Sequence, residues 1–82
     1  MGKREKLVKR LKRIPADLTW DELRAVLKAL GYRELQGRGS RVKFDNGNPE
    51  QMISLHKPNP GNIVKRYAIR QVIEKLEQGG LI

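Results

Sequence analysis

The chain has 82 residues, of which 18 are lysine or arginine and 9 are aspartate or glutamate, so its formal net charge at pH 7 is +9. Its length suits one domain with a thin core, because a chain of this size buries only about 60 to 65% of the surface that it exposes when unfolded. With no cysteine and one histidine it cannot form disulfide bonds or thiolate metal sites, and we expect neither a bound metal nor a cofactor.

The charge and the hydropathy also bear on partners and location. A strongly basic chain attracts polyanions, and the attraction is fast and sensitive to salt. No apolar run reaches the roughly 18 to 20 residues of a membrane span, and residues 1–6 are charged with no apolar stretch behind them. We therefore expect a cytoplasmic protein with no membrane contact.

Residues 1–13 contain seven basic residues and one acidic residue. They include most of a narrow apolar stripe with helical spacing, formed by Leu7, Val8, Leu11 and Ile14. The pattern predicts a short basic helix that Pro15 ends. The segment could be a phosphate-binding arm, a solvated helix that rests its stripe on the core, or a poorly ordered terminus. We treat residues 1–14 as a basic helical extension and residues 15–82 as the domain.

The next helix has the clearest start, because Thr19 and Glu22 have the spacing of a capping box. Apolar residues recur after it at intervals of three and four, namely Trp20, Leu23, Val26, Leu27 and Leu30. Gly31 stands where a left-handed C-terminal cap belongs. We expect Trp20 in the core rather than stacked on a base, since it is in register with the leucines.

Three short strands are expected after this helix, over residues 32–36, 41–45 and 51–56. Turns rich in glycine or asparagine separate them, and the proline-rich segment 57–61 must be a loop. Asn62 is expected to cap the last helix, whose apolar stripe is Ile69, Val72, Ile73 and Leu76. Gly79 and Gly80 should end this helix, and Leu81 and Ile82 should fold back onto the core.

This order of elements predicts an α+β fold. We expect the α-β-β-β-α arrangement of double-stranded-RNA-binding-like domains, with two helices on one face of a three-stranded antiparallel sheet and the extra N-terminal helix before it.

The second expected strand alternates in character. Arg41 and Lys43 belong to one face and Val42 and Phe44 to the other. Cations beside a turn with exposed N–H groups favour a phosphate-binding site, although an ordinary solvated hairpin has the same alternation. The chain has few aromatic residues, which argues against a base-stacking platform for single strands.

Residues 19–82 resemble a known family. The features that carry the resemblance are Leu30-Gly31-Tyr32 at the end of a helix, then Gly39-Ser40-Arg41-Val42-Lys43-Phe44, a strand that ends at His56, a Pro-Gly loop, a helix and a Gly-Leu tail. In these features the chain is similar to the HicA toxins of bacterial and archaeal toxin–antitoxin pairs. The resemblance implies a small endoribonuclease that cleaves messenger RNA without a metal and is silenced by a HicB-like antitoxin.

The chain departs from that family at one position. The family typically has a histidine, thought to be catalytic, after the Gly-Ser pair, and this chain has Arg41 there. An arginine stays protonated, so it can hold a phosphate but cannot take a proton from a ribose 2′-hydroxyl.

His56 is then the one side chain of a type that exchanges protons near neutral pH. Metal-free RNA cleavage needs a base, a proton donor and a cation on the phosphate, so we assign His56, Arg41 and Ser40 as the candidate catalytic set. A regular meander would bring His56 close to Arg41. The alternative for His56 is a strand-end histidine bonded to a local backbone group.

The candidate RNA-binding residues are those of the turn, the second strand, the proline-rich loop and the start of the last helix: Arg38, Gly39, Lys43, Lys57, Asn59, Lys65, Arg66 and Arg70. For Arg66 and Arg70 the alternative is an ordinary surface ladder of charges. The sequence therefore predicts an RNA-binding toxin of a HicA/HicB pair that cleaves messenger RNA. The alternatives are a nucleic-acid-binding module without nuclease activity, and a domain whose basic face meets an acidic protein.

Overall fold

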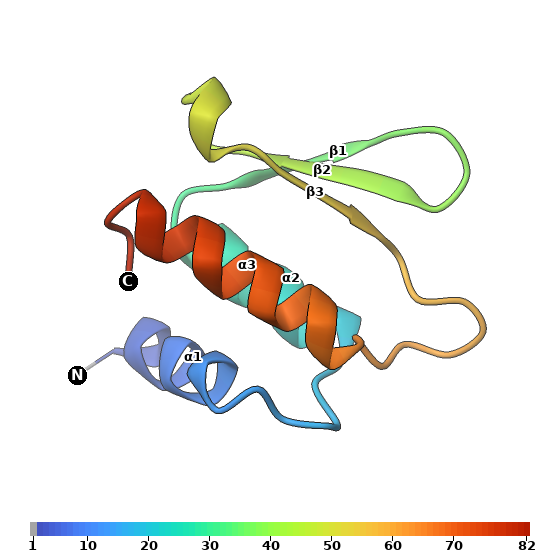
Figure 1. Ribbon diagram of the computed structural model, residues 1–82, viewed down its shortest axis with the longest axis horizontal. Helices are drawn as coiled ribbons and strands as arrows, with labels where there is room; N and C mark the ends of the chain where they lie inside the picture. The colour runs from blue at the N-terminus through green and yellow to red at the C-terminus, as the bar shows by residue number, and fades with distance from the viewer. Residues whose placement is uncertain (1) are drawn as a thin grey trace.

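The structure is a computed structural model that describes residues 2–82, and it is an α+β fold with one antiparallel sheet. Three strands lie in the order β1-β2-β3, and the helices lie on one side of the sheet (Figure 1). The elements are α1 (Lys3–Lys12), α2 (Trp20–Ala29), β1 (Arg33–Gln36), β2 (Arg41–Asp45), a 3₁₀ helix (Pro49–Gln51), β3 (Ile53–His56) and α3 (Arg66–Gln78). The expected α-β-β-β-α order and the extra N-terminal helix are both confirmed.

Alternation in β2 and β3 builds the core between the sheet and the helices. Val42 and Phe44 are buried on one face of β2, while Arg41 and Lys43 are exposed on the other. The ring of Phe44 packs 5.9 Å from that of Trp20, measured between centroids, and both rings are buried. The expectation that Trp20 is a core residue is confirmed.

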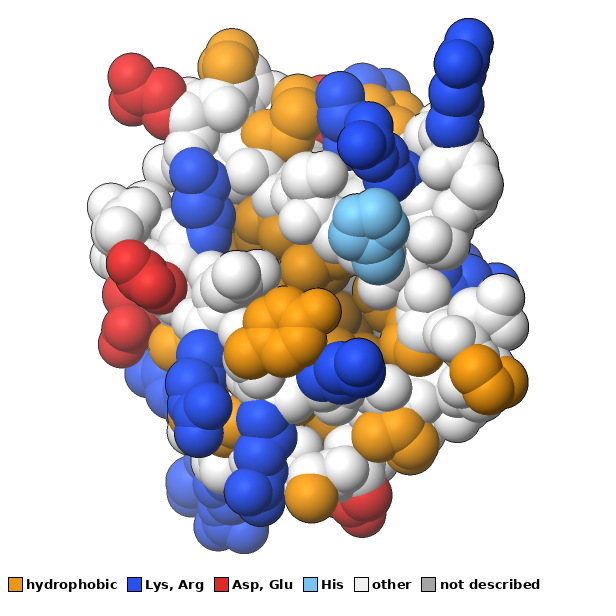
Figure 2. Space-filling model, turned by 45° about the vertical axis from the view of Figure 1, so that its right-hand side comes forward, with side chains coloured by type: hydrophobic (Ala, Val, Ile, Leu, Met, Phe, Trp, Pro, Cys, Tyr) orange, Lys and Arg blue, Asp and Glu red, His pale blue; other side chains and the backbone are white. Residues whose placement is uncertain are grey.

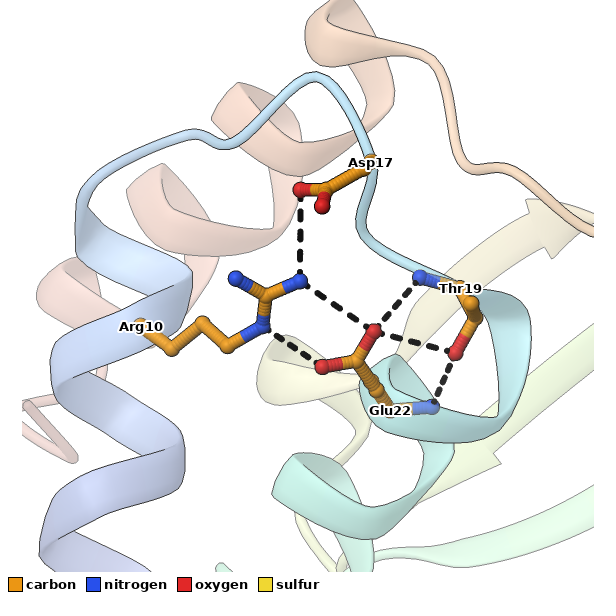
Figure 3. Close-up of polar contacts among 4 residues, drawn as sticks. All are labelled: Arg10, Asp17, Thr19 and Glu22. Carbon is orange, nitrogen blue, oxygen red and sulfur yellow. Dashed lines mark hydrogen bonds and ion pairs between the residues drawn. The ribbon is translucent and has the colours of Figure 1, made fainter.

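The start of α2 is fixed by the capping box that the sequence predicts. Thr19 Oγ1 accepts a hydrogen bond from the Glu22 N–H, and Glu22 Oε1 accepts one from the Thr19 N–H, each at 3.1 Å (Figure 3). At the other end of the helix Gly31 has φ +93°, the left-handed conformation that a C-terminal cap needs. Both ends of α2 are therefore local features of the sequence.

The N-terminal helix α1 packs on α2 and α3. Its Leu11 is fully buried in the core. Arg10 binds the Glu22 carboxylate with two nitrogens and reaches Asp17 at 3.3 Å, so α1 and the start of α2 are joined by a forked ion pair (Figure 3). Of the three interpretations of residues 1–14, the packing matches a solvated helix whose apolar stripe rests on the core.

Two boundaries differ from the expectation. The strand expected over residues 51–56 begins only at Ile53, because Asn48 caps a 3₁₀ turn that occupies Pro49–Gln51. Asn62 does not cap the last helix, and that expectation was wrong. Its carbonyl accepts the Trp20 N–H at 2.7 Å, and residues 62–64 run beside the segment before α2, so α3 begins at Arg66. The loop between β3 and α3 is therefore longer than its prolines suggest.

The C-terminal expectations hold. α3 ends at Gln78 with Gly79 as its cap, and Leu81 and Ile82 are half-buried against the core. The stripe of Ile69, Val72 and Leu76 is buried, and Ile73 beside it is half-buried.

Candidate functional site

The register of β2 and β3 brings the candidate residues to one place on the sheet. Arg41 pairs with His56, and Val42 pairs with Leu55. Paired residues of antiparallel strands project to the same face, and because Val42 and Leu55 are buried, Arg41 and His56 share the exposed face. The regular meander expected from the sequence is present, and His56 lies beside the start of β2.

Ser40 contacts the histidine ring, with its Oγ 3.3 Å from His56 Nδ1. The backbone positions this contact, because the Lys57 N–H donates to the Ser40 carbonyl at 2.8 Å and so extends the pairing of the strands by one residue. When Nδ1 carries the ring proton it donates to Ser40 Oγ, and Nε2 is then a free proton acceptor. Within the described chain the imidazole thus has a side chain as its hydrogen-bonding partner, rather than the backbone group that the alternative interpretation supposed.

An open groove of about 570 Å³ begins at His56 and runs towards the start of α3. It is lined by Ser40, residues 56–60, residues 63–65 and residues 67 and 68, and we call it the His56 groove. Figure 2 shows the pale blue histidine at the edge of a hollow in which hydrophobic side chains are visible. The site therefore combines a proton-exchanging ring, cations and an apolar wall.

The cations of the site are free of acidic partners. None of the five ion pairs found in residues 2–82 includes Arg41, Lys57 or Lys65. On the face drawn in Figure 2 the acidic side chains lie towards the margins, away from the histidine. The positive charge of this surface is therefore available to an anionic ligand.

The remaining candidate residues fall into two groups. Gly39 and Asn59 line a second, shallower groove of about 400 Å³ that adjoins the first and shares Ser40 and Lys57 with it. The others are exposed but line neither groove: Arg38, Lys43, Arg66 and Arg70. The structure thus brings together the strand-end and loop residues and leaves the rest on the surrounding surface.

Two residues of the groove were not anticipated from the sequence. Tyr67 is 60% exposed and Ile63 is 46% exposed, and both line the His56 groove. Tyr67 lies off the buried stripe of α3, so helical periodicity alone places it on the surface. Ile63 had no such signal, because its place depends on the pairing with Thr19.

The fold and the site can be set beside known proteins. A family model described as the HicA toxin of bacterial toxin–antitoxin systems matches residues 20–81, which is most of the chain. The chain belongs to the HicA toxin family. No curated protein and no solved structure matched it.

The HicA match runs from the start of α2 to just beyond α3, so it includes the sheet and the whole His56 groove, while α1 precedes it. This HicA family member is thereby related to toxins of toxin–antitoxin pairs. In residues 2–82 no helix has the length and apolar character needed to cross a membrane. The same residues hold no group of three or more His, Cys, Asp or Glu side chains placed to bind a metal ion.

Proposed function

We propose that this HicA family member acts on RNA in the cytoplasm, as an endoribonuclease that cleaves messenger RNA. The observation that carries the proposal is the arrangement of His56, which contacts Ser40 at 3.3 Å and pairs with Arg41 on the exposed face of the sheet. Cleavage of a phosphodiester by a neighbouring hydroxyl needs a base, a proton donor and a cation on the phosphate, and His56 and Arg41 supply the base and the cation.

In the proposed reaction His56 Nε2 takes the proton of a ribose 2′-hydroxyl, and the 2′-oxygen attacks the adjacent phosphorus. The bond from phosphorus to the 5′-oxygen breaks, and that oxygen takes a proton from solvent. Arg41 pairs with the non-bridging phosphate oxygens and stabilises their charge. Ser40 positions the imidazole. The products are a 2′,3′-cyclic phosphate and a 5′-hydroxyl end, and no step needs a metal ion.

In this proposal the RNA strand is held by the cations and the neutral polar groups around this centre. Those in the two grooves are Gly39, Lys57, Asn59 and Lys65, and those on the surrounding surface are Arg38, Lys43, Arg66 and Arg70. Their contacts are to phosphates, so they supply affinity and a steep dependence on salt rather than sequence preference.

The test is cleavage of a transcribed messenger RNA by the purified protein in the presence of a chelator. The variant His56→Ala should lower the rate by about 100-fold or more, as expected for loss of a general base. Ser54→Ala is the matched control, because Ser54 is exposed on the same face of β3, two residues away. Intact RNA across a pH series, or equal rates for His56→Ala and the parent, would refute the assignment.

A second candidate function follows from Arg41, which stands where the family typically has its histidine. If the arginine serves only to clamp phosphate, the chain is a nucleic-acid-binding module without nuclease activity. That function predicts binding that weakens by several orders of magnitude between 50 and 200 mM salt if about six or more phosphates are contacted, with no strand scission. The chelator assay and a binding assay on the same RNA separate the two.

Membership of a toxin–antitoxin family also points to a protein partner, and we propose a HicB-like antitoxin that covers the cationic surface of the site. Its own surface should be acidic where it meets Arg41 and Lys57, since unpaired cations are costly to bury. If expression of the chain alone stops growth, co-expression with a HicB-like protein from the reading frame adjacent to its gene should restore growth. Absence of a complex between the two purified proteins would count against this partner.

A further inference from the structure

The His56 groove gathers most of the exposed apolar surface contributed by large side chains. Among the described residues three large hydrophobic side chains are exposed, and two of them, Ile63 and Tyr67, line this groove. A single exposed apolar side chain on a protein surface is ordinary. Two in one groove, beside the candidate catalytic histidine, indicate a surface that is covered when a ligand binds.

Among the phenylalanine, tyrosine and tryptophan side chains of the described residues, Tyr67 alone is exposed to solvent. Trp20 and Tyr32 are each 3% exposed and Phe44 is fully buried, whereas Tyr67 is 60% exposed. One exposed ring is too few for a platform that stacks several bases, but it can meet a single base at the groove. Tyr67 is the second residue of α3. The apolar stripe of this helix is buried in the core, so the backbone that carries Tyr67 is held in place.

The segment that carries Ile63 is fixed to the rest of the domain. The Val64 N–H donates to the Leu18 carbonyl at 2.8 Å, and the Asn62 carbonyl accepts the Trp20 N–H. These bonds hold residues 62–64, and with them Ile63, against the segment before α2. The groove is thus largely preformed, which lowers the cost of ordering it around a ligand.

The residues that line the groove suit a nucleotide. Ser40, His56, Ile63 and Tyr67 line it, and Lys57 and Lys65 supply positive charge. A nucleotide has the same composition, since a flat base with an apolar face is flanked by anionic phosphates. A protein helix or strand would need a longer apolar stripe, and here only two large hydrophobic side chains are exposed beside two lysines.

We propose that the His56 groove is a base-binding subsite, in which the ring of Tyr67 stacks on one unpaired nucleobase next to the phosphate held at Arg41 and His56. The inference rests on the proposed action on RNA and narrows the substrate to single-stranded RNA, because a paired base cannot offer its face. Ile63 covers the edge of the same base. Preference for one base is then determined by Tyr67 and Ile63, which line the same groove as the catalytic His56.

The test measures binding of short 2′-O-methyl oligoribonucleotides, which lack the 2′-hydroxyl nucleophile and so cannot be cleaved. A matched oligonucleotide of the same length carries abasic sugar-phosphate units in place of nucleosides. Tyr67→Ala should weaken binding of the base-containing probe by about 5- to 140-fold, the measured range for loss of one stacked base, and Tyr67→Phe should stay within about twofold of the parent. Gln78→Ala, an exposed residue at the far end of α3, is the matched control and should change neither affinity.

The abasic probe decides whether the effect concerns the base. It should bind the parent and Tyr67→Ala equally, because its phosphates still meet the lysines. Equal binding of the base-containing probe by both proteins would overturn the inference, as would an equal weakening of the two probes. It is also overturned if no probe binds at 50 mM salt, or if Tyr67→Ala weakens only the complex with the protein of the adjacent reading frame.

The two proposals fail separately. Cleavage that depends on His56, together with binding that ignores Tyr67, removes the base subsite and leaves the nuclease. Binding that depends on the base and on Tyr67, in a protein that never cleaves RNA, removes the nuclease and leaves the subsite.

Discussion

Replacing Leu11 with alanine should destabilise the whole domain, although Leu11 precedes the region that the family model matches. Its side chain is fully buried between α1 and the other helices. The change removes three carbons at about 0.8 kcal/mol for each buried group, or about 2.4 kcal/mol, and the cavity left behind can raise the loss to about 5 kcal/mol. A domain of 82 residues has a free energy of unfolding of only about 4 to 12 kcal/mol, so a large part of it would be lost.

Urea denaturation followed by circular dichroism measures this loss, from the midpoint and the slope of the transition. Lys9→Ala is the control on the same helix, because Lys9 is exposed and alanine is an equally good helix former, so its midpoint should hardly move. A loss below about 0.5 kcal/mol for Leu11→Ala would show that α1 does not share the core. Residues 1–14 would then be a separate arm rather than part of one folding unit.

Three further outcomes concern charge and backbone. The Arg10 guanidinium and the N–H of Thr19 lower the pKa of Glu22. The ionised carboxylate therefore stabilises the fold above pH 4.5, and this contribution fades as the pH falls below that value. Glu22→Gln should remove the contribution, which is measured as the urea midpoint at a series of acidic pH values. Gly31→Ala should cost about 1 to 2 kcal/mol in the same urea assay, since φ is +93° there. Arg41→Gln should reduce the slope of log affinity for RNA against log salt by about 0.7 to 0.9, in a binding titration at several salt concentrations.

A specific result would contradict each of these three predictions. If Glu22→Gln loses stability in acid as steeply as the parent, the ion pair with Arg10 does not lower the pKa of Glu22 in solution. An unchanged midpoint for Gly31→Ala would contradict the left-handed cap of α2. An unchanged salt slope for Arg41→Gln would show that no phosphate is neutralised at Arg41, and the catalytic set would lose its cation.

The pairing of Arg41 with His56 has a consequence for the proposed chemistry. The two residues are paired across β2 and β3, so a guanidinium and an imidazole lie side by side on the exposed face of the sheet. In the proposed reaction the base is on β3 and the cation is its paired residue on β2. The proposed activity therefore depends on the pairing of two strands rather than on a single residue.

The sequence by itself determined the features that depend on near neighbours. The capping box of Thr19 and Glu22 spans four residues, and the alternation of β2 separates charged from apolar side chains within one strand. Gly31 ends α2 because glycine, which has no Cβ, adopts φ +93° without strain. The order of elements, and hence the α+β fold, follows from these local signals.

Only the tertiary structure decided where distant segments meet. The carbonyl of Asn62 is taken by the N–H of Trp20, 42 residues earlier, and this long-range bond moves the start of α3 to Arg66. The same pairing carries Ile63 to the groove, and the packing of α3 places Tyr67 in the groove that His56 also lines. Periodicity describes one element at a time, so it cannot show which side chains from separate elements face one another across a cavity.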